Sequence, residues 1–294
     1  MDVAAFAQPT PAIIAAANNC DVGLLRRELD LGVSVDLEDF AGRTPLQVVC
    51  RTSRNHLQEL GCNESARTAC VKLLIERGAC VDAGLPHNPG RSHFPLSAPH
   101  LTPLMYIALR TNLEVVKMLL CAGADANAPI VCQQETITTL CRAVVEYCRC
   151  SINANQAEHA EMAASLEEKR QCAFVVDALL KAGADPNGPK YSDRSAIEWA
   201  IGVAEMGCDN RPLWPILLRA GAILPTDDCV YFSNWATQRA HPYLQKIDAA
   251  GGWKAYEKAH RTKLLATFVP KFTHLVPPEL VPLILEFSFH IGFY

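Results

Sequence analysis

One feature of this sequence constrains its fold more than any other: a helix-opening motif and a helix-closing motif recur along the chain. The stretch LTPLMYIALRTNLEVVKMLLCAGADANAP at 101–129 contains both, with the opener at Thr102 and the closer at Gly123, 21 residues later. The same motifs can be aligned at the openers Thr10, Thr44, Thr138 and Ser195 and the closers Gly32, Gly78, Gly183 and Gly221. Since 12 further residues separate Gly32 from Thr44, the unmodified unit has a period of about 33 residues. The chain is therefore predicted to contain five copies of one unit.

The residues of the quoted unit predict two antiparallel helices. Thr102 can accept hydrogen bonds from free amide groups at a helix start, and Pro103 suits the first helical position because it has no N–H to satisfy. Apolar residues then recur at helical spacing in two runs, which are Leu104, Ile107 and Ala108, followed by Leu113, Val116, Leu119 and Leu120. Gly123 can close the second helix in a left-handed conformation, and Asp125 with Asn127 favours a turn. A single helix pair cannot bury its apolar faces, so neighbouring pairs must stack.

From about residue 8 to about residue 224 the chain resembles the ankyrin repeat family. The segments that carry the resemblance are RTPLQVVC at 43–50, LTPLMYIA at 101–108, GADANA at 123–128, GADPNG at 183–188 and AGA at 220–222. It implies an all-α solenoid of five helix pairs that binds another protein. The family's usual His after T-P-L is replaced by Ile13, Gln47, Met105, Cys141 and Glu198. This replacement predicts the loss of a hydrogen bond that normally ties adjacent loops together.

Three units are longer than the 21-residue spacing from Thr102 to Gly123, by 13, 24 and 5 residues. The extra residues fall between the two helices of a unit, at 51–65, 148–171 and 203–212, and predict that one side of the solenoid is built out. In the second of these inserts we expect longer helices on both sides of a short loop at Ser151 to Asn155. The Pro- and His-rich segment 84–100 instead predicts an extended loop on the opposite, hairpin side.

The period ends after Gly221, which predicts two domains: the solenoid at 1–224 and a helical C-terminal module at 225–294. Helical patterns occur at 229–240, 251–268 and 277–291, with a turn at 241–250. One interpretation is that the module caps the open end of the stack, as a solenoid requires. Its last helix would then bury Leu280, Ile284 and Leu285. The other is that Phe289, Phe293 and Tyr294 form an exposed apolar docking site for a partner.

The C-terminal module also offers two functional alternatives. The segment LVPPELVPLILEF at 275–287 resembles the opening helix of an F-box, and RTKLLATFVPKF at 261–272 more distantly resembles a SOCS box. Either resemblance implies a substrate-receptor adaptor that docks on a ubiquitin ligase through the C-terminal helices. The competing hypothesis is a scaffold or assembly subunit whose surfaces are covered by neighbours in a larger complex. The sequence does not separate the two.

Composition limits the kinds of partner. The net charge of −4 argues against the basic stripe that binds nucleic-acid phosphates. The N-terminus lacks the features of a signal peptide, and no apolar segment reaches the roughly 20 residues that a membrane span requires. Thirteen cysteines without close, regular spacing indicate reduced thiols. We therefore expect an intracellular protein, in the cytoplasm or alternatively in the nucleus.

Motifs of enzymes and cofactor sites were not found. The sequence has no phosphate-cradling glycine loop, no H-E-x-x-H and no G-x-S-x-G, so no catalytic residue, cofactor or small-molecule substrate is expected. Two groups of candidate metal ligands exist, which are Cys80, His87, His93 and His100, and Cys141, Cys148, Cys150 and Cys172. The first group fits no compact zinc template. The second is interpreted as thiols buried between helices, because free Cys behaves as a small apolar residue. No metal site is predicted.

The family resemblance implies where a partner binds. Ankyrin repeat proteins typically hold their partners with hairpin-loop tips and the inner ends of first helices. Carried onto this sequence, these positions are Phe40, Arg43, Arg51, Thr52, Leu101, Leu109, Arg110, Ile137, Glu146 and Arg194. Four of them are arginines, which pair with carboxylates and often dominate interface energy. The sequence therefore predicts a protein partner with an acidic surface.

Overall fold

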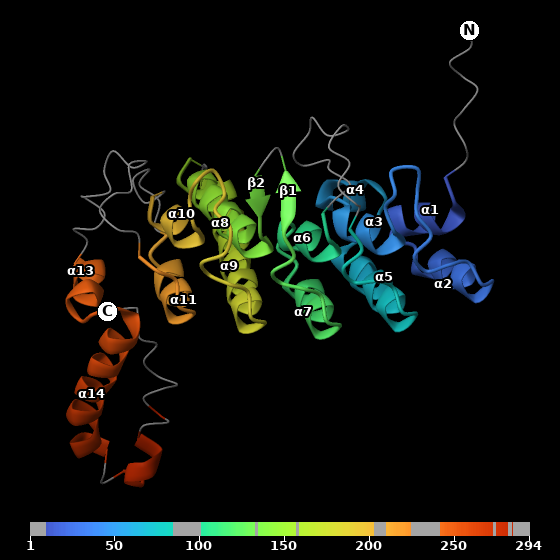
Figure 1. The fold of residues 1–294 in the computed structure, drawn as a ribbon. Coiled ribbons are helices and arrows are strands. Elements are labelled where there is room, and N and C mark those ends of the chain that lie inside the picture. Colours follow the sequence, from blue (N-terminus) through green and yellow to red (C-terminus); the bar gives the residue numbers. More distant parts are fainter. Residues whose placement is uncertain are drawn as a thin grey trace.

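The computed structural model describes residues 10–84, 101–132, 135–156, 159–202, 210–224, 242–272, 275–281 and 284. Five helix pairs stack in sequence order among these residues, as predicted, with first helices in one layer and second helices in another (Figure 1). The pairs are α1 (Ala12–Asn18) with α2 (Val22–Asp30), α3 (Pro45–Arg51) with α5 (Glu64–Glu76), α6 (Pro103–Ala108) with α7 (Leu113–Cys121), α8 (Thr139–Gln156) with α9 (His159–Lys181), and α10 (Ala196–Gly202) with α11 (Leu213–Arg219). Buried apolar side chains form one continuous core through the stack.

Four of the five predicted openers cap the first helix of their unit. The side-chain oxygen of Thr44, Thr102, Thr138 or Ser195 accepts a hydrogen bond from the amide three residues later, at 3.3–3.4 Å. Thr44 forms a reciprocal capping box with Gln47. In the first unit the N-cap position belongs to Pro11, which makes no side-chain cap hydrogen bond. Thr10 therefore aligns with the other openers in the sequence but does not cap α1.

The five predicted closers are confirmed by their backbone conformation. Gly32, Gly78, Gly123, Gly183 and Gly221 have φ angles between 83° and 101°. An L-amino acid side chain is strained in this left-handed region, whereas glycine is not. Each glycine therefore ends the second helix of its unit and turns the chain toward the hairpin loop.

A ladder of hydrogen bonds joins consecutive hairpin loops. In each of the first four units, the side chain four residues after the closing glycine accepts a hydrogen bond at 2.7–3.0 Å from the next unit. The donor is the amide two residues after that unit's closing glycine. The accepting side chains are Asp36, Asp82, Asn127 and Asn187. The two asparagines also donate to the carbonyls of Gly183 and Gly221, both at 2.9 Å.

Gln47 restores the loop contact that the sequence predicted to be lost. Its amide nitrogen donates to the carbonyls of Ala83, at 2.9 Å, and Leu101, at 3.1 Å. The prediction is therefore wrong for this unit, because a glutamine amide can donate two hydrogen bonds.

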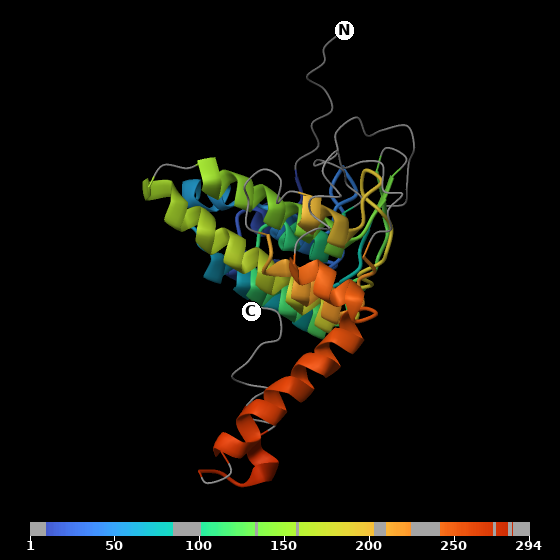
Figure 2. The ribbon, with the colours of Figure 1, turned by 90° about the vertical axis from the view of Figure 1, so that its left-hand side faces the viewer.

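Two of the three inserts are helical among the described residues. The second unit adds α4 (Arg54–Glu59) between α3 and α5, and the fourth unit lengthens both α8 and α9, as predicted. Figure 2 shows the ends of α8 and α9 reaching beyond the neighbouring pairs. The predicted loop at Ser151 to Asn155 is wrong, since α8 continues to Gln156 and both Ser151 and Ala154 are buried. The predicted loop at 84–100 and the fifth-unit insert lie mostly outside the described residues.

A small strand pair precedes the fourth unit on the hairpin side. Strands β1 (Ile130–Cys132) and β2 (Glu135–Ile137) are antiparallel, with Ile130 opposite Ile137. The fold is otherwise helical among the described residues.

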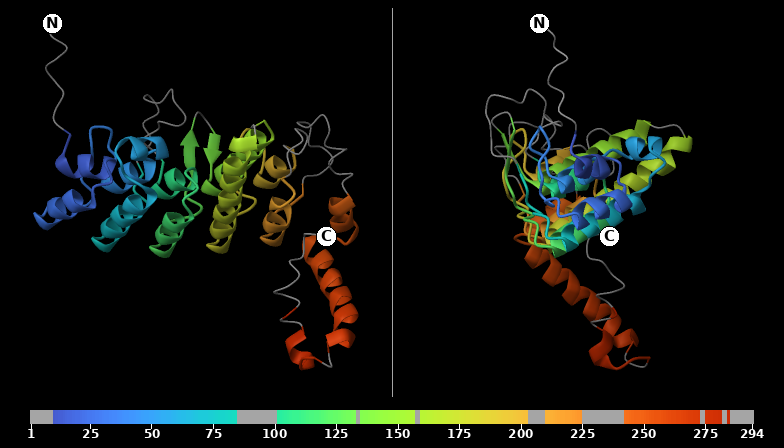
Figure 3. Two further views of the ribbon diagram at one scale, coloured as in Figure 1. Left: turned by 180° about the vertical axis from the view of Figure 1, so that it is seen from behind. Right: turned by 90° about the vertical axis from the view of Figure 1, so that its right-hand side faces the viewer.

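The C-terminal helices continue from the last unit. The turn expected at 241–250 is wrong: α13 (Pro242–Ala249) is a helix, since Leu244 and Ile247 are one turn apart and both buried. α14 (Trp253–Phe272) runs past the predicted end at 268 and points away from the stack (Figures 2 and 3). Tyr243 of α13 lies between α11 and the start of α14, with its ring centroid 6.4 Å from those of both Trp214 and Trp253.

The predicted last helix is described only at its beginning, where a 3-10 turn spans Pro278–Leu280. Leu280 is 44% exposed, so its predicted role as a buried capping contact is wrong, and the neighbouring Val281 is buried in its place. The pattern at 229–240 and the residues Leu285, Phe289, Phe293 and Tyr294 lie outside the described residues.

Candidate functional site

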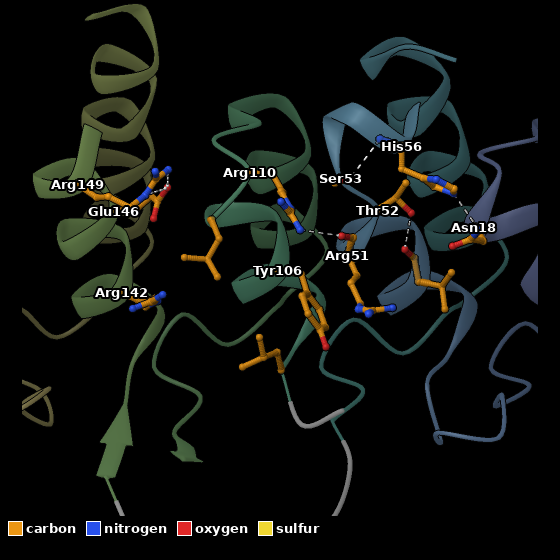
Figure 4. Close-up of a pocket in the computed structure, with 13 residues that line it drawn as sticks. Asn18, Arg51, Thr52, Ser53, His56, Tyr106, Arg110, Arg142, Glu146 and Arg149 are labelled. Atoms are coloured by element: carbon orange, nitrogen blue, oxygen red, sulfur yellow. Dashed lines mark hydrogen bonds and ion pairs between the residues drawn. The ribbon is translucent and has the colours of Figure 1, made fainter. Parts of the chain in front are cut away.

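A groove of about 620 Å³ lies along the inner face, which is the face formed by the first helices. The predicted partner-binding residues that line it are Arg51, Thr52, Leu101, Leu109, Arg110 and Glu146. Sequence reasoning missed the other lining residues, which are Asn18, Val48, Ser53, His56, Tyr106, Arg142 and Arg149. Figure 4 shows side chains from four consecutive units around this groove.

Four of the seven missed residues follow a register that is present in the sequence. Counted from the opener of each unit, the position eight residues later supplies Asn18, Thr52, Arg110 and Glu146. One helical turn earlier, the position four residues after the opener supplies Val48, Tyr106 and Arg142. Residues i and i+4 lie on the same face of a helix. The i, i+4 spacing of these residues is therefore visible in the sequence. The family resemblance pointed only to the hairpin-loop tips and the inner ends of the first helices.

Positive charge dominates the groove. Arg51, Arg110, Arg142 and Arg149 face one carboxylate, Glu146, which pairs with Arg149 at 2.5 Å. No carboxylate of a described residue forms an ion pair with Arg51 or Arg142. The arrangement can bind anionic groups, since guanidinium pairs with a carboxylate through two parallel hydrogen bonds.

Two of the arginines are fixed by contacts of their own. Arg110 donates to the backbone carbonyl of Arg51 at 3.2 Å, across the interface between the second and third units. Burial, and then the nearby charge of Arg67, lower the pKa of Arg110, although an arginine remains protonated. The pKa of Arg149 is raised by the hydrogen bond that Arg149 makes with Glu146. Both side chains therefore keep their charge and stiffen the wall of the groove.

The insert helix α4 closes one side of the groove. Ser53 caps α4 by accepting from the amide of His56 at 3.1 Å. The His56 ring lies 3.2 Å from the amide nitrogen of Asn18 in the first unit. These contacts place polar groups opposite the arginines of the third and fourth units.

Arg54 ties the two inserts together across the shorter third unit. Its guanidinium lies 3.3 Å from Glu168 of α9, and it donates at 3.2 Å to the carbonyl of Arg110 and to the hydroxyl of Thr111. It also lies 3.7 Å from Glu64. One side chain thus connects three units next to the groove.

The remaining predicted site residues occupy different surroundings. Phe40 is 67% exposed at a hairpin-loop tip, and Arg43 pairs with Asp39 in the same loop. Ile137 is half-buried on β2, and Arg194 stacks over the ring of Trp199 at 4.9 Å. None of these four lines the groove. Thr52 and Leu101 do line it, but each is only 6% exposed, so they form its floor.

The structure describes the two groups of candidate metal ligands to different extents. Of the first group, only Cys80 lies among the described residues. The second group is buried as predicted, with the sulfur atoms of Cys150 and Cys172 3.9 Å apart. In the described part of the chain, no three His, Cys, Asp or Glu side chains are grouped so as to hold a metal ion. No described helix is long and apolar enough to cross a membrane.

Stacked helix pairs, closed by left-handed glycines and joined by laddered hairpin loops, define a repeat solenoid of the protein-binding class. Residues 12–130 match the family model described as ankyrin repeats (3 copies), so this part of the chain is an array of ankyrin repeats. The matched segment spans the first three units, while the C-terminal helices are not matched. No curated protein matches the chain. Ankyrin repeats are protein–protein interaction modules.

Proposed function

We propose that this protein binds an acidic segment of a partner protein in the groove and acts as a scaffold or assembly subunit. The observation that carries the proposal is the excess of arginine over carboxylate in the groove, in a chain whose net charge is −4. A local positive surface on a negative protein selects acidic partners and repels basic ones.

The proposal divides the chain into two functional parts. The solenoid, to residue 224, supplies the groove, and the module from 225 onward supplies the helices that follow the last unit. The contact of Tyr243 with Trp214 of α11, extended by the contact of Trp253 with Tyr243, supports a capping role for the start of this module. The alternative function, an adaptor of a ubiquitin ligase, has no supporting observation among the described residues. A docking role for Phe289, Phe293 and Tyr294 remains a prediction.

Charge reversal tests the groove. We expect the double variant Arg51→Glu/Arg142→Glu to lose its partner in affinity purification followed by mass spectrometry, because reversed charges at an interface cost several kcal/mol, roughly. The matched control is Arg26→Glu/Arg27→Glu, which makes the same charge change on exposed positions of α2. Both variants should keep the helical circular dichroism spectrum of the parent, since Arg26 and Arg27 are exposed, while Arg51 and Arg142 are half-buried and form no ion pair with a described carboxylate. An unchanged set of bound proteins in the groove variant would refute the proposed function.

A further inference from the structure

The groove leaves two cationic positions open, one on each side of the third unit. Arg51 comes from α3 and Arg142 from α8, and neither forms an ion pair with a described carboxylate. The guanidinium carbon of Arg142 lies 5.7 Å from the ring centroid of Tyr191. In Figure 4 the two arginines lie on either side of Tyr106. Their charges are therefore two separate anchors and not one cluster.

The floor of the groove between these anchors comes from the third unit and is apolar, whereas Arg110 of the same unit donates to the backbone carbonyl of Arg51. Leu101 and Tyr106 are buried at its floor, and Leu109 is half-buried at its edge. Along the stack, the groove thus presents a cation, then an apolar floor, then a second cation. A complementary ligand carries an anion, an apolar group and a second anion in the same order.

Packing geometry sets the distance between the two anions. The helices α3, α6 and α8 are consecutive neighbours in the inner layer. Packed helices lie about 8–10 Å apart, so equivalent positions two units apart are separated by about 16–20 Å. An extended chain rises about 3.3 Å per residue, which gives about five or six residues over this distance. Because arginine side chains are long and can lean inward, about four residues also suffice.

We propose that the groove recognises an extended segment with two acidic side chains about four to six residues apart and an apolar side chain between them. This inference rests on the proposed function and names the motif that the partner carries. An extended segment is favoured over a helix because helix-in-groove recognition uses an apolar groove, whereas this lining is mostly polar. A helix would also need its two acids about eleven residues apart to span the same distance.

Synthetic peptides test the spacing on the purified full-length protein. The series carries two Glu residues about two, five or eleven positions apart, with a central Leu in an otherwise Gly/Ser peptide, and fluorescence anisotropy at low salt measures Kd. We expect the peptide with the spacing of about five to bind most tightly. Replacing either Glu with Gln should weaken it about fivefold, the upper range for a partly exposed ion pair. Replacing the central Leu with Ser should weaken it as well.

Single arginine variants test the two-anchor arrangement. In the Arg51→Gln variant, one of the two Glu→Gln replacements in the peptide should no longer change the Kd. In the Arg142→Gln variant, the other replacement should no longer change it. The control variant Arg27→Gln on α2 should leave the Kd of every peptide unchanged. Equal binding at all spacings, a preference for the longest spacing, or dependence on only one arginine would overturn the two-anchor motif. In that case the proposed function still stands if the charge-reversed groove variant loses its partner. If that variant keeps all its partners, the proposed function itself fails.

Discussion

At the scale of single residues, Asp39 shows how one carboxylate shapes a predicted contact site. Its side chain accepts from the amides of Ala41 and Arg43 at 2.8 and 2.9 Å and from the Arg43 guanidinium at 2.7 Å. Burial raises the pKa of Asp39. The hydrogen bonds from Arg43 and from the amide of Ala41, together with the charge of Arg43, lower it by more, so the pKa lies below its ordinary value. The loop that carries exposed Phe40 is therefore held by an ionised group.

Replacing this carboxylate should make the loop less stable in a pH-dependent way. We expect Asp39→Asn to lower the free energy of unfolding by about 1–2 kcal/mol at pH 7. A lowered folded-state pKa means that the contribution is complete above the unfolded pKa of 3.8 and is lost as pH falls through the folded value. In urea denaturation the difference between parent and variant should therefore shrink below about pH 4.

The control for this prediction is Asp30→Asn, which removes an exposed carboxylate from a surface ion pair with Arg77. It should cost less than about 1 kcal/mol. A difference between parent and Asp39→Asn that grows on acidification would contradict the assignment of Asp39 as an ionised acceptor.

At the scale of elements, the hairpin-loop ladder differs between the two halves of the stack. Asn127 and Asn187 each accept from the next loop and also donate to its glycine carbonyl. Asp36 and Asp82 occupy the equivalent positions and only accept, because an ionised carboxylate has no hydrogen to donate. The first half of the ladder therefore lacks one hydrogen bond per step.

Adding the missing hydrogen bond to one step of the hairpin-loop ladder should stabilise the stack. We expect Asp82→Asn to keep the bond from the amide of Asp125 and to add a donor toward the carbonyl of Gly123, raising the free energy of unfolding by about 0.5–1.5 kcal/mol. The reciprocal variant Asn187→Asp should lower it by a similar amount. Both values can be measured by urea denaturation at neutral pH. The idea fails if Asp82→Asn destabilises the protein while Asn187→Asp leaves it unchanged.

At the scale of the whole molecule, the last unit is covered by the start of the C-terminal module. The rings of Trp214, Tyr243, Trp253 and Tyr256 form one cluster with centroid distances of 5.8–6.4 Å. Beyond this cluster α14 leaves the stack, and Trp253 is its only buried residue among those described. Attachment of the module is thus concentrated in the first turns of α14.

Truncation of the cluster should uncap the stack. We expect Trp253→Ala to lower the free energy of unfolding by about 3 kcal/mol, because it removes a large side chain that is only 6% exposed. Phe268→Ala changes another aromatic residue of the same helix, which is half-buried beyond the cluster, and should have a smaller effect. Thermal unfolding followed by circular dichroism measures both. Equal destabilisation by the two variants would show that the whole length of α14 is packed, contrary to this account.

The sequence by itself determined the repeating unit. Thr102 and three of its four equivalents cap the starts of helices, and Gly123 and its equivalents end them, because capping and left-handed turns depend on residues adjacent in the chain. The same local logic predicted the longer helices of the fourth unit, but it failed where burial decided the outcome. Ser151 lies inside a helix and Leu280 is exposed, since each depends on what packs against it.

Only the tertiary structure decided the groove. Arg51 and Arg142 are 91 positions apart in the sequence and come together because the units stack. Their role, and that of Tyr106, depends on which face of each first helix points inward. Arg43 and Arg194 have the same charge but lie elsewhere, held by Asp39 and Trp199. Local sequence specifies each helix, whereas the site is made of contacts between units, which no single unit contains.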